Sequence, residues 1–381
     1  MAKIRTAMIG TGFMGKVHTE AVRRLGNVEV AAVAGAEEEH ARSFAAAHHI
    51  PRFTGDWTTL VGDKEIDAVH VLTPNVLHGP MSIAFAKAGQ NVICEKPLCM
   101  SSAEAQLMLD AAEASGVAHA TNHNLRCYPM VQHVRAMIAA GELGDVLAVQ
   151  GTYSQDWLLY DTDYNWRIEA ESNGRLRAMG DIGSHWMDQI QHVTGLNITS
   201  VCAELTTFHK TRKKPKGSVE TFTGKTLTPS DYTEIPIATD DFGTVMLHLG
   251  DRARGAFTVS QVAAGNKNQF LFEIYGTKAG VRWSQERPDE LWIGHRNSPN
   301  QFIVKDGSLM LGGSASYADL PGGHSEGYDD AHKQLFKRFY ARVADRSAPV
   351  EYPTFADGLH GMKVLEAVLA SHEKRGWVDV A

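Results

Sequence analysis

The segment Gly10-Thr11-Gly12-Phe13-Met14-Gly15 decides the fold of the N-terminal third of the chain. It closes an apolar run that begins at Ile4 and opens a helical pattern that continues to Leu25. In such a strand-turn-helix unit the first glycine permits a tight turn, the second lets the backbone approach a pyrophosphate, and the third permits close helix packing. The helix N-terminus offers amides and a positive dipole end to phosphates. We therefore predict a dinucleotide site formed by Gly10, Gly12, Phe13, Met14 and Gly15; a glycine turn that binds nothing is the alternative.

Short apolar runs alternate with helical patterns as far as residue 123. This alternation predicts a parallel sheet with helices on both faces, and right-handed crossovers make it a doubly wound α/β fold. We expect a dinucleotide-binding Rossmann domain at residues 1–123. The expected strands are 4–10, 28–34, 68–73, 91–95 and 117–122, and the expected helices are 15–25, 37–48, 78–88 and 102–115, the last opened by a serine N-cap.

The rhythm changes after Arg126, where strands follow one another without intervening helices. This pattern indicates a mainly antiparallel, open sheet, so we expect a substrate-binding and oligomerisation α+β domain at residues 124–381. Its expected helices are 129–140, 329–345 and 355–372, and its expected strands include 146–155, 243–249, 254–261 and 269–275. Residues 211–230 are expected to form a solvated excursion, with Arg212-Lys213-Lys214 in a surface loop rather than a phosphate or nucleic-acid site.

Composition excludes several classes of partner. A chain of 381 residues exceeds the size at which one core keeps growing, so two domains are the default. The net charge of -7 provides no basic surface for nucleic acid or anionic lipid. No apolar run approaches the roughly 20 residues that cross a bilayer, so we expect no membrane partner and a cytoplasmic location. The four cysteines lack a CxxC pair and are expected to be reduced, mostly buried thiols, with no metal site.

The end of the second strand bears on the choice of cofactor. Gly35-Ala36 stands there, followed by Glu37, Glu38 and Glu39. Three carboxylates without an adjacent arginine repel a 2'-phosphate, so we predict NAD rather than NADP, with Glu37 as the ribose partner. The alternative is that these glutamates only complement the dipole of the following helix.

Two other strand ends carry polar side chains. The strand 68–73 leads into Thr73-Pro74-Asn75-Val76-Leu77-His78, and the strand 91–95 leads into Glu95-Lys96-Pro97. Ligands of open α/β sheets bind at the carboxyl edge. We therefore expect Thr73, Pro74, Asn75, His78, Glu95 and Lys96 at the cofactor site, although a lysine at a strand end is often only solvated surface.

These segments, together with Asp181-Ile182-Gly183-Ser184-His185, resemble the Gfo/Idh/MocA family of glucose-fructose oxidoreductase and inositol dehydrogenase relatives. The similarity extends over essentially the whole chain, and an EKP tripeptide followed by a distant DxGxH is close to diagnostic. The resemblance implies that Lys96, Asp181 and His185 meet over the nicotinamide ring as the catalytic group.

Oxidation of a secondary alcohol sends hydride to the cofactor while a base removes the hydroxyl proton. His185 is the preferred base because imidazole titrates near neutrality. Lys96 would then stabilise the charge on the reacting oxygen; the reverse assignment, with Lys96 as base, stays open. Asp181 would orient the pair and bind a substrate hydroxyl, and it would share a helix face with His185 if a helix begins near Gly183.

The resemblance adds further cofactor contacts. It implies that Glu95 binds the nicotinamide ribose and that Asn122, Asn124 and Arg126 pass beside the ring. It also implies that the pair Trp166-Arg167 reaches the cofactor. For Arg167 the alternative is a salt bridge to a neighbouring carboxylate, either Glu169 or Asp163.

Residues 153–167 combine aromatic faces with carboxylates and amides, a mixture that suits a sugar ring. With residues 321–328, this segment resembles the family branch that acts on pyranoses such as levoglucosan. The candidate substrate contacts are Tyr153, Asp156, Trp157 and His324, alongside Arg167, Lys96, Asp181 and His185. The aromatic residues among them could equally be core or interface filler.

The resulting hypothesis is NAD-dependent oxidation of a secondary hydroxyl of a pyranose, anhydrosugar or cyclic polyol to a ketone. A second is a family member that retains NAD and recycles it between two sugars or in oxidation-assisted glycoside cleavage. A third is a non-catalytic dinucleotide-binding protein, against which the trio Lys96, Asp181 and His185 argues. An open sheet face needs covering, so we expect a homo-oligomer, and the family resemblance implies a homodimer or homotetramer.

Overall fold

The computed structural model describes residues 3–216 and 232–381, and the chain divides into two compact units. The first unit comprises Met1–His123 and His332–Met362, and the second comprises Asn124–Ala331 and Lys363–Ala381. The first unit therefore includes a segment from the C-terminal part of the chain, which the sequence patterns do not indicate. The assignment of cofactor binding to one unit and substrate binding to the other stays a prediction.

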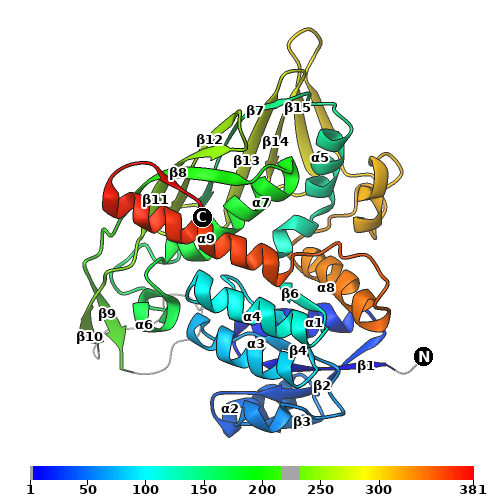
Figure 1. The fold of residues 1–381 in the computed structure, drawn as a ribbon, viewed down its shortest axis with the longest axis vertical. Helices are drawn as coiled ribbons and strands as arrows, with labels where there is room; N and C mark the ends of the chain where they lie inside the picture. Colours follow the sequence, from blue (N-terminus) through cyan, green and yellow to red (C-terminus); the bar gives the residue numbers. More distant parts are fainter. Residues whose placement is uncertain (1–2, 217–231) are drawn as a thin grey trace. The chain divides into compact units, whose positions relative to one another are not determined.

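The first unit contains a six-stranded parallel sheet in the order β3-β2-β1-β4-β5-β6 (Figure 1). This is the doubly wound order whose direction changes between β1 and β4, so the predicted Rossmann fold is confirmed. The strands are β1 (Ile4–Ile9), β2 (Val28–Ala34), β3 (Arg52–Thr54), β4 (Ala68–Val71), β5 (Asn91–Cys94) and β6 (His119–Thr121). The connecting helices are α1 (Phe13–Arg23), α2 (Glu38–Ala47), α3 (His78–Lys87) and α4 (Ser102–Ala114), and most of α8 (Tyr328–Ala344) and the start of α9 (Phe355–Lys374) also belong to this unit.

The inner strands of this sheet are covered on both faces. Every residue of β4 and β5 is buried, as expected for parallel strands with helices on either side. The short edge strand β3 was not predicted, because its three residues, Arg-Phe-Thr, form no apolar run. Helix α4 has the expected serine cap: the Ser101 hydroxyl accepts from the amide of Glu104 at 3.2 Å, and the Glu104 carboxylate accepts from the amide of Met100 at 2.9 Å.

The second unit contains a nine-stranded sheet in the order β16-β15-β14-β13-β7-β12-β11-β8-β17. All neighbouring strands are antiparallel except β7 and β12, so the predicted mainly antiparallel sheet is confirmed. The strands are β7 (Val146–Ser154), β8 (Ile198–Thr206), β11 (Phe242–Leu249), β12 (Ala253–Ser260), β13 (Gln269–Gly276), β14 (Gly280–Ser284), β15 (Glu290–Gly294), β16 (Gln301–Val304) and β17 (Val378–Asp379). The helices include α5 (Pro129–Ala139), α6 (Ala170–Asn173) and α7 (Ser184–Thr194).

Helix α7 is fixed on this sheet through Trp186. The Trp186 ring stacks on Phe257 of β12, with ring centroids 4.3 Å apart and planes 9° from parallel. Its indole nitrogen donates to the carbonyl of Leu271 on β13 at 3.0 Å. Both rings are fully buried, so the first turn of α7, which also carries His185, has a defined position on the sheet.

The prediction of a solvated excursion at residues 211–230 is wrong for its beginning. Residues Thr211–Pro215 form strand β9, which pairs with β10 (Tyr232–Pro236) in a two-stranded sheet. The Arg212 side chain is fully buried, while Lys213 and Lys214 are partly exposed and pair with Asp161 and Glu169. The Arg212-Lys213-Lys214 cluster is therefore held by carboxylates and is not a solvated loop. Residues 217–230 of the predicted excursion lie outside the described part of the chain.

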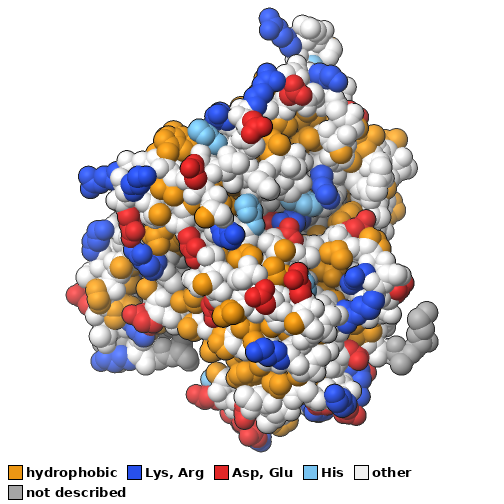
Figure 2. All heavy atoms as spheres, viewed as in Figure 1, with side chains coloured by type: hydrophobic (Ala, Val, Ile, Leu, Met, Phe, Trp, Pro, Cys, Tyr) orange, Lys and Arg blue, Asp and Glu red, His pale blue; other side chains and the backbone are white. Residues whose placement is uncertain are grey.

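On the face that Figure 2 shows, lysine and arginine side chains are interspersed with acidic ones and form no continuous basic surface. Among the described residues, no helix combines the length and apolar character needed to cross a membrane. Cys94, Cys99 and Cys127 are buried and Cys202 is partly buried, all as free thiols.

Two glycines one turn apart in α9 provide a test of this packing. A Cβ at Gly358 would lie 2.6 Å from the Thr121 hydroxyl and 2.7 Å from Leu98, whereas a Cβ at Gly361 would meet nothing within 4 Å. We expect Gly358→Ala to destabilise the protein by about 1–3 kcal/mol through overpacking. We expect Gly361→Ala to stabilise it by about 0.5–1 kcal/mol, because alanine loses less backbone entropy in a helix. Thermal unfolding of both variants measures the signs, and equal shifts would contradict the packing described.

Candidate active site

The glycines of the first loop have different surroundings. Gly10 has a φ of +133°, and a Cβ there would lie 2.6 Å from the carbonyl oxygen of Leu72. A Cβ at Gly15 would lie 2.5 Å from the carbonyl oxygen of Gly10. A Cβ at Gly12 would meet no protein atom within 4 Å, and helix α1 begins there without a side-chain cap. Packing therefore requires Gly10 and Gly15, while Gly12 borders open space at a helix N-terminus, which fits a dinucleotide pyrophosphate.

The segment after β4 is connected to the segment after β5 by His78. One His78 ring nitrogen lies 2.9 Å from the carbonyl oxygen of Thr73, and the other lies 3.1 Å from that of Pro97. Burial lowers the pKa of His78 below its ordinary value, despite these carbonyls. His78 thus acts locally as a bridge between two strand ends, while Pro74 is partly exposed and Asn75 is buried in the turn η2 (Asn75–Leu77).

Glu95 is held by buried donors. Its carboxylate accepts from the amide of Asn122 at 2.5 Å and lies 2.9 Å from Nε2 of His18. His18 Nδ1 lies 2.7 Å from Nδ1 of His70, and His70 Nε2 lies 2.7 Å from the hydroxyl of Tyr340. Burial lowers the pKa of His18 to about 3, so its ring is neutral. Lys96 follows directly, is partly exposed, and precedes a cis peptide bond to Pro97.

The direction of this chain of hydrogen bonds follows from its ends. A carboxylate only accepts, so the neutral His18 ring donates from Nε2 and accepts at Nδ1. His70 must then donate from Nδ1 and accept at Nε2 from the Tyr340 hydroxyl. Burial lowers the pKa of His70 as well, followed by the effect of the nearby His18. Tyr340 thus donates to His70, His70 donates to His18, and His18 donates to Glu95.

In the second unit, Asp181 lies in the π-helical turn η5 (Met179–Gly183), and His185 lies in the first turn of α7. The Asp181 carboxylate accepts from the amide of Gln261 at 2.8 Å and lies 3.6 Å from Nε of Arg167. The alternative partners for Arg167, Glu169 and Asp163, are therefore not the ones found. Its guanidinium also lies over the ring of Trp166, 4.4 Å from the ring centroid.

Tyr153 completes this group. Its ring centroid is 6.3 Å from that of His185, and its hydroxyl donates to Asn268 at 2.8 Å. Burial raises the pKa of Tyr153, and the negative charge of Asp181 raises it further. The structure thus brings Tyr153, Arg167, Asp181 and His185 together.

The structure assigns other roles to several candidate substrate contacts. Asp156 forms an ion pair with Lys267 at 2.6 Å. Trp157 donates to Gln155 and packs against the buried cluster of Leu158, Ile168 and Ile237. His324 is exposed in the loop before α8, and among the described contacts its ring touches only the carbonyl of Gly322. Their contact with a substrate stays a prediction.

Among the expected cofactor contacts, Glu37 precedes α2 as its N-cap residue with a side chain that is 73% exposed. Asn124 is buried in the turn η3 (Asn124–Cys127). Arg126 makes two hydrogen bonds to Asp188 of α7, at 2.8 and 2.5 Å. Arg126 therefore fixes the helix that carries His185.

Family models match both parts of the chain. Residues 4–123 match the oxidoreductase family with an NAD-binding Rossmann fold, and residues 131–282 match the GFO/IDH/MocA C-terminal domain. The chain belongs to the Gfo/Idh/MocA family. It is 28% identical to levoglucosan dehydrogenase of Pseudarthrobacter phenanthrenivorans, over 100% of this chain and 99% of the relative. Glucose-6-phosphate 3-dehydrogenase of Bacillus subtilis is 24% identical, over 95% and 94% of the two chains.

Solved structures agree with this assignment. A levoglucosan dehydrogenase in complex with NADH and levoglucosan superposes with a TM-score of 0.88 at 27% identity, covering 100% of this chain and 99% of the other. An inositol dehydrogenase homologue of Azotobacter vinelandii complexed with NAD+ gives 0.86 at 25% identity, covering 99% and 97%. The chain is therefore an NAD-dependent oxidoreductase of the sugar dehydrogenase type, and the NAD prediction is confirmed at the level of the family.

Gly12 provides a direct test of the cofactor loop. We expect Gly12→Ala to fold normally, because a Cβ there meets no protein atom, and to weaken NADH binding about tenfold or more by occupying the space beside the pyrophosphate. Gly313→Ala is the control, since a Cβ at this exposed glycine also meets nothing within 4 Å. Fluorescence titration with NADH measures both. Wild-type affinity in Gly12→Ala would show that no phosphate approaches this glycine.

The buried histidine makes stability depend on pH. The pKa of His18 falls from 6.5 to about 3 on folding, so between these values the unfolded chain takes up a proton that the folded one does not. Stability is therefore lost as pH falls below about 6.5, by about 2 kcal/mol at pH 5 from this group alone. We expect His18→Gln to show a smaller drop in urea midpoint between pH 7 and pH 5 than the wild type. The exposed His40→Gln variant should keep the full drop; an equal drop in His18→Gln would contradict a neutral buried ring.

Proposed function

We propose that this protein oxidises a secondary hydroxyl of a pyranose, anhydrosugar or cyclic polyol to a ketone, with Lys96, Asp181 and His185 as the catalytic group. The observation that carries the proposal is the cluster around Asp181, where a carboxylate, a guanidinium, a phenol and an imidazole lie together in the second unit. Lys96 is included in the catalytic group because it stands in the segment Glu95-Lys96-Pro97, which resembles the EKP motif of the family.

The chemistry divides into a hydride and a proton. Bound NAD+ supplies the hydride acceptor. The substrate carbon loses its hydrogen as hydride, the C–O bond becomes a carbonyl, and the hydroxyl proton goes to a base. We assign the base to His185 and the stabilisation of the reacting oxygen to the ammonium of Lys96. The opposite assignment predicts that Lys96, rather than His185, sets the pH at which turnover begins.

Asp181 supports the group as an ionised acceptor. Its two carboxylate oxygens face Arg167 and Gln261, and because each carboxylate oxygen accepts more than one hydrogen bond, we assign it the role of acceptor for a substrate hydroxyl. Tyr153 presents a buried ring next to His185, an apolar surface of the kind on which the C–H face of a sugar ring packs. These features support a polyhydroxylated ring as the substrate.

The relatives narrow the panel of substrates. The relatives are named for levoglucosan, glucose 6-phosphate and inositol, all of them cyclic compounds with several secondary hydroxyls. The site described in the second unit contains one guanidinium, that of Arg167, and this is already paired with Asp181. We therefore expect uncharged rings to be better substrates than phosphorylated ones.

We also propose that the large sheet pairs with a second copy of the chain in a homodimer or homotetramer. Its outward face includes Met246 of β11 and Ala256 of β12, which pair with each other across the two strands and are both exposed. Light scattering coupled to gel filtration measures the mass. The cytoplasmic location stays a prediction.

The proposed reaction is tested with a panel of levoglucosan, glucose, glucose 6-phosphate and myo-inositol, each with NAD+ and NADP+, followed by the appearance of reduced cofactor. We expect turnover with NAD+ and an uncharged ring. Lys96→Ala, His185→Ala and Asp181→Asn should each lower kcat about 100-fold or more.

His40→Ala and Lys87→Ala serve as controls for this series, because both side chains are exposed on helices of the first unit. They should leave kcat unchanged. Unchanged turnover in Lys96→Ala, His185→Ala or Asp181→Asn would contradict the catalytic group. NAD that remains bound through gel filtration, with turnover only when two sugars are present, would favour internal recycling of the cofactor.

A further inference from the structure

Gln261 is the residue that fixes one oxygen of the Asp181 carboxylate. It follows the last residue of β12 and its side chain is fully buried. Its amide nitrogen lies 2.8 Å from Oδ2 of Asp181. Both backbone polar groups of Gln261 are also hydrogen-bonded. Its N–H donates to the carbonyl of Asp241 at 3.0 Å, and its carbonyl accepts from the N–H of Leu158 at 3.1 Å.

The orientation of the Gln261 amide is determined by Arg177. Nη1 of Arg177 lies 3.0 Å from Oε1 of Gln261. A guanidinium only donates, so the oxygen of the amide must face Arg177 and the NH2 group must face Asp181. The NH2 group in turn only donates, so Asp181 must accept. This contact therefore favours the ionised form of Asp181 as well as one direction of its carboxylate.

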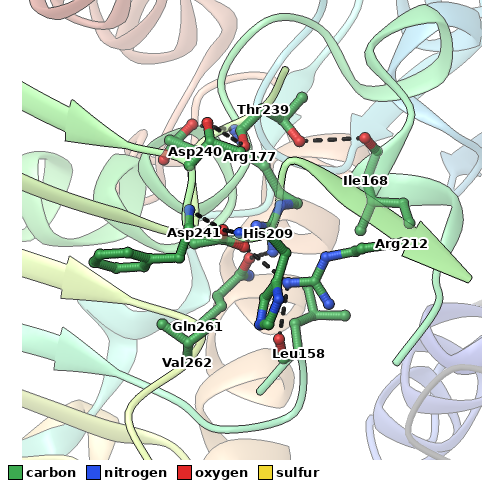
Figure 3. Close-up of polar contacts among 12 residues, drawn as sticks. Leu158, Ile168, Arg177, His209, Arg212, Thr239, Asp240, Asp241, Gln261 and Val262 are labelled. Atoms are coloured by element: carbon green, nitrogen blue, oxygen red, sulfur yellow. Dashed lines mark hydrogen bonds and ion pairs between the residues drawn. The ribbon is translucent and has the colours of Figure 1, made fainter. Parts of the chain in front are cut away.

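Arg177 is itself part of a buried charged cluster (Figure 3). Its guanidinium and that of Arg212 both donate to Oδ1 of Asp241, and all three side chains have no exposed surface. Oδ2 of Asp241 accepts from the N–H groups of Phe208 at 2.7 Å and His209 at 3.0 Å. Burial alone would raise the pKa of Asp241, but the two guanidiniums and the N–H groups outweigh it and keep the pKa below its ordinary value. Both oxygens of Asp241 are therefore engaged, and its contact with Arg177 leaves that side chain little freedom.

The same cluster also holds the segment 154–166. The Arg212 guanidinium donates to the carbonyl oxygens of Leu158 at 2.9 Å, Tyr160 at 2.8 Å and Asp163 at 3.2 Å. Tyr153 directly precedes this segment and Arg167 directly follows it, and both belong to the proposed site. The position of the segment and the orientation of the Gln261 amide thus depend on the same carboxylate.

We propose that Gln261 is a positioning residue for Asp181, and that the Arg177–Asp241–Arg212 cluster acts through it to keep the carboxylate ionised and aimed into the site. The inference rests on the proposed function, because it assumes that Asp181 belongs to the catalytic group. It assigns a part in the reaction to a residue that carries no catalytic motif.

The first test replaces the donor by an acceptor. In Gln261→Glu, Arg177 keeps its partner, but a second carboxylate stands beside Asp181 and favours its protonation. The Asp181 signal in 13C-aspartate-labelled protein, assigned by its loss in Asp181→Asn, should titrate about one pH unit higher or more. With the ring compound that the wild type oxidises fastest, kcat/KM at pH 7 should fall about tenfold or more because the carboxylate is no longer aimed by a donor, and the acid limb of the pH profile should move to higher pH by the same shift as the Asp181 signal.

The matched control is Gln150→Glu. Gln150 also donates its amide to a carboxylate, that of Glu273, on the same sheet but at an exposed position of β7. The substitution makes the same chemical change away from the site, so the titration of Asp181 and the pH profile should stay as in the wild type.

A second variant provides the test if Gln261→Glu folds poorly. Gln261→Met keeps the shape without the donor or a new charge, and it too should raise the titration of Asp181 and lower kcat/KM, while the NADH affinity stays within about twofold. A wild-type titration and a flat pH dependence of the loss in both variants would overturn the inference. Unchanged turnover in Asp181→Asn would instead reject the proposed function, so the two failures are distinguishable.

Discussion

A carboxylate without access to water is tolerated only where donors surround it, and Asp241 is the clearest example in this protein. Two guanidiniums and two backbone N–H groups compensate its charge. A buried ion tolerates little change in its partners. The groups that the two arginines bind, such as the Gln261 amide and the Leu158 carbonyl, are therefore also held in place. The first unit follows the same rule on a smaller scale, with His18 and Asn122 on Glu95. Each unit thus contains a proposed functional carboxylate, Asp181 or Glu95, whose orientation is fixed by buried hydrogen-bond donors.

Local patterns predicted much of this protein and long-range pairs escaped them. The glycine loop, the alternating strands and the DxGxH helix can be identified because their physical reasons operate within a few residues: a turn, a period, a cap. Arg212 could not be placed in this way, because its neighbours are polar and its partner Asp241 is 29 residues away. Gln261 and Asp181 are 80 residues apart, and no pattern around either residue indicates the other.

Arg167 shows why a choice between nearby partners was wrong. Both neighbouring carboxylates are already engaged: Glu169 by Lys214 and Tyr164, and Asp163 by the N–H of Tyr160. The carboxylate that Arg167 approaches instead belongs to Asp181, which the fold brings near. The aromatic and acidic segment before Arg167 was predicted as substrate contacts for its composition, yet Asp156 and Trp157 have partners inside the protein. Their contact with a substrate therefore stays a prediction that composition alone cannot decide.

The first unit is assembled from two distant pieces of the chain. Tyr340 ends the hydrogen-bond chain that starts at Glu95, and the backbone of residues 353 and 354 bonds to Thr121 on the edge strand β6. During synthesis the ribosome therefore delivers all six strands of the sheet long before the residues that cover His70 and the end of β6. The nascent N-terminal sheet therefore stays incompletely covered until nearly the whole polypeptide has emerged from the ribosome. A polypeptide that ends after β6 would lack the residues that cover His70 and the end of β6.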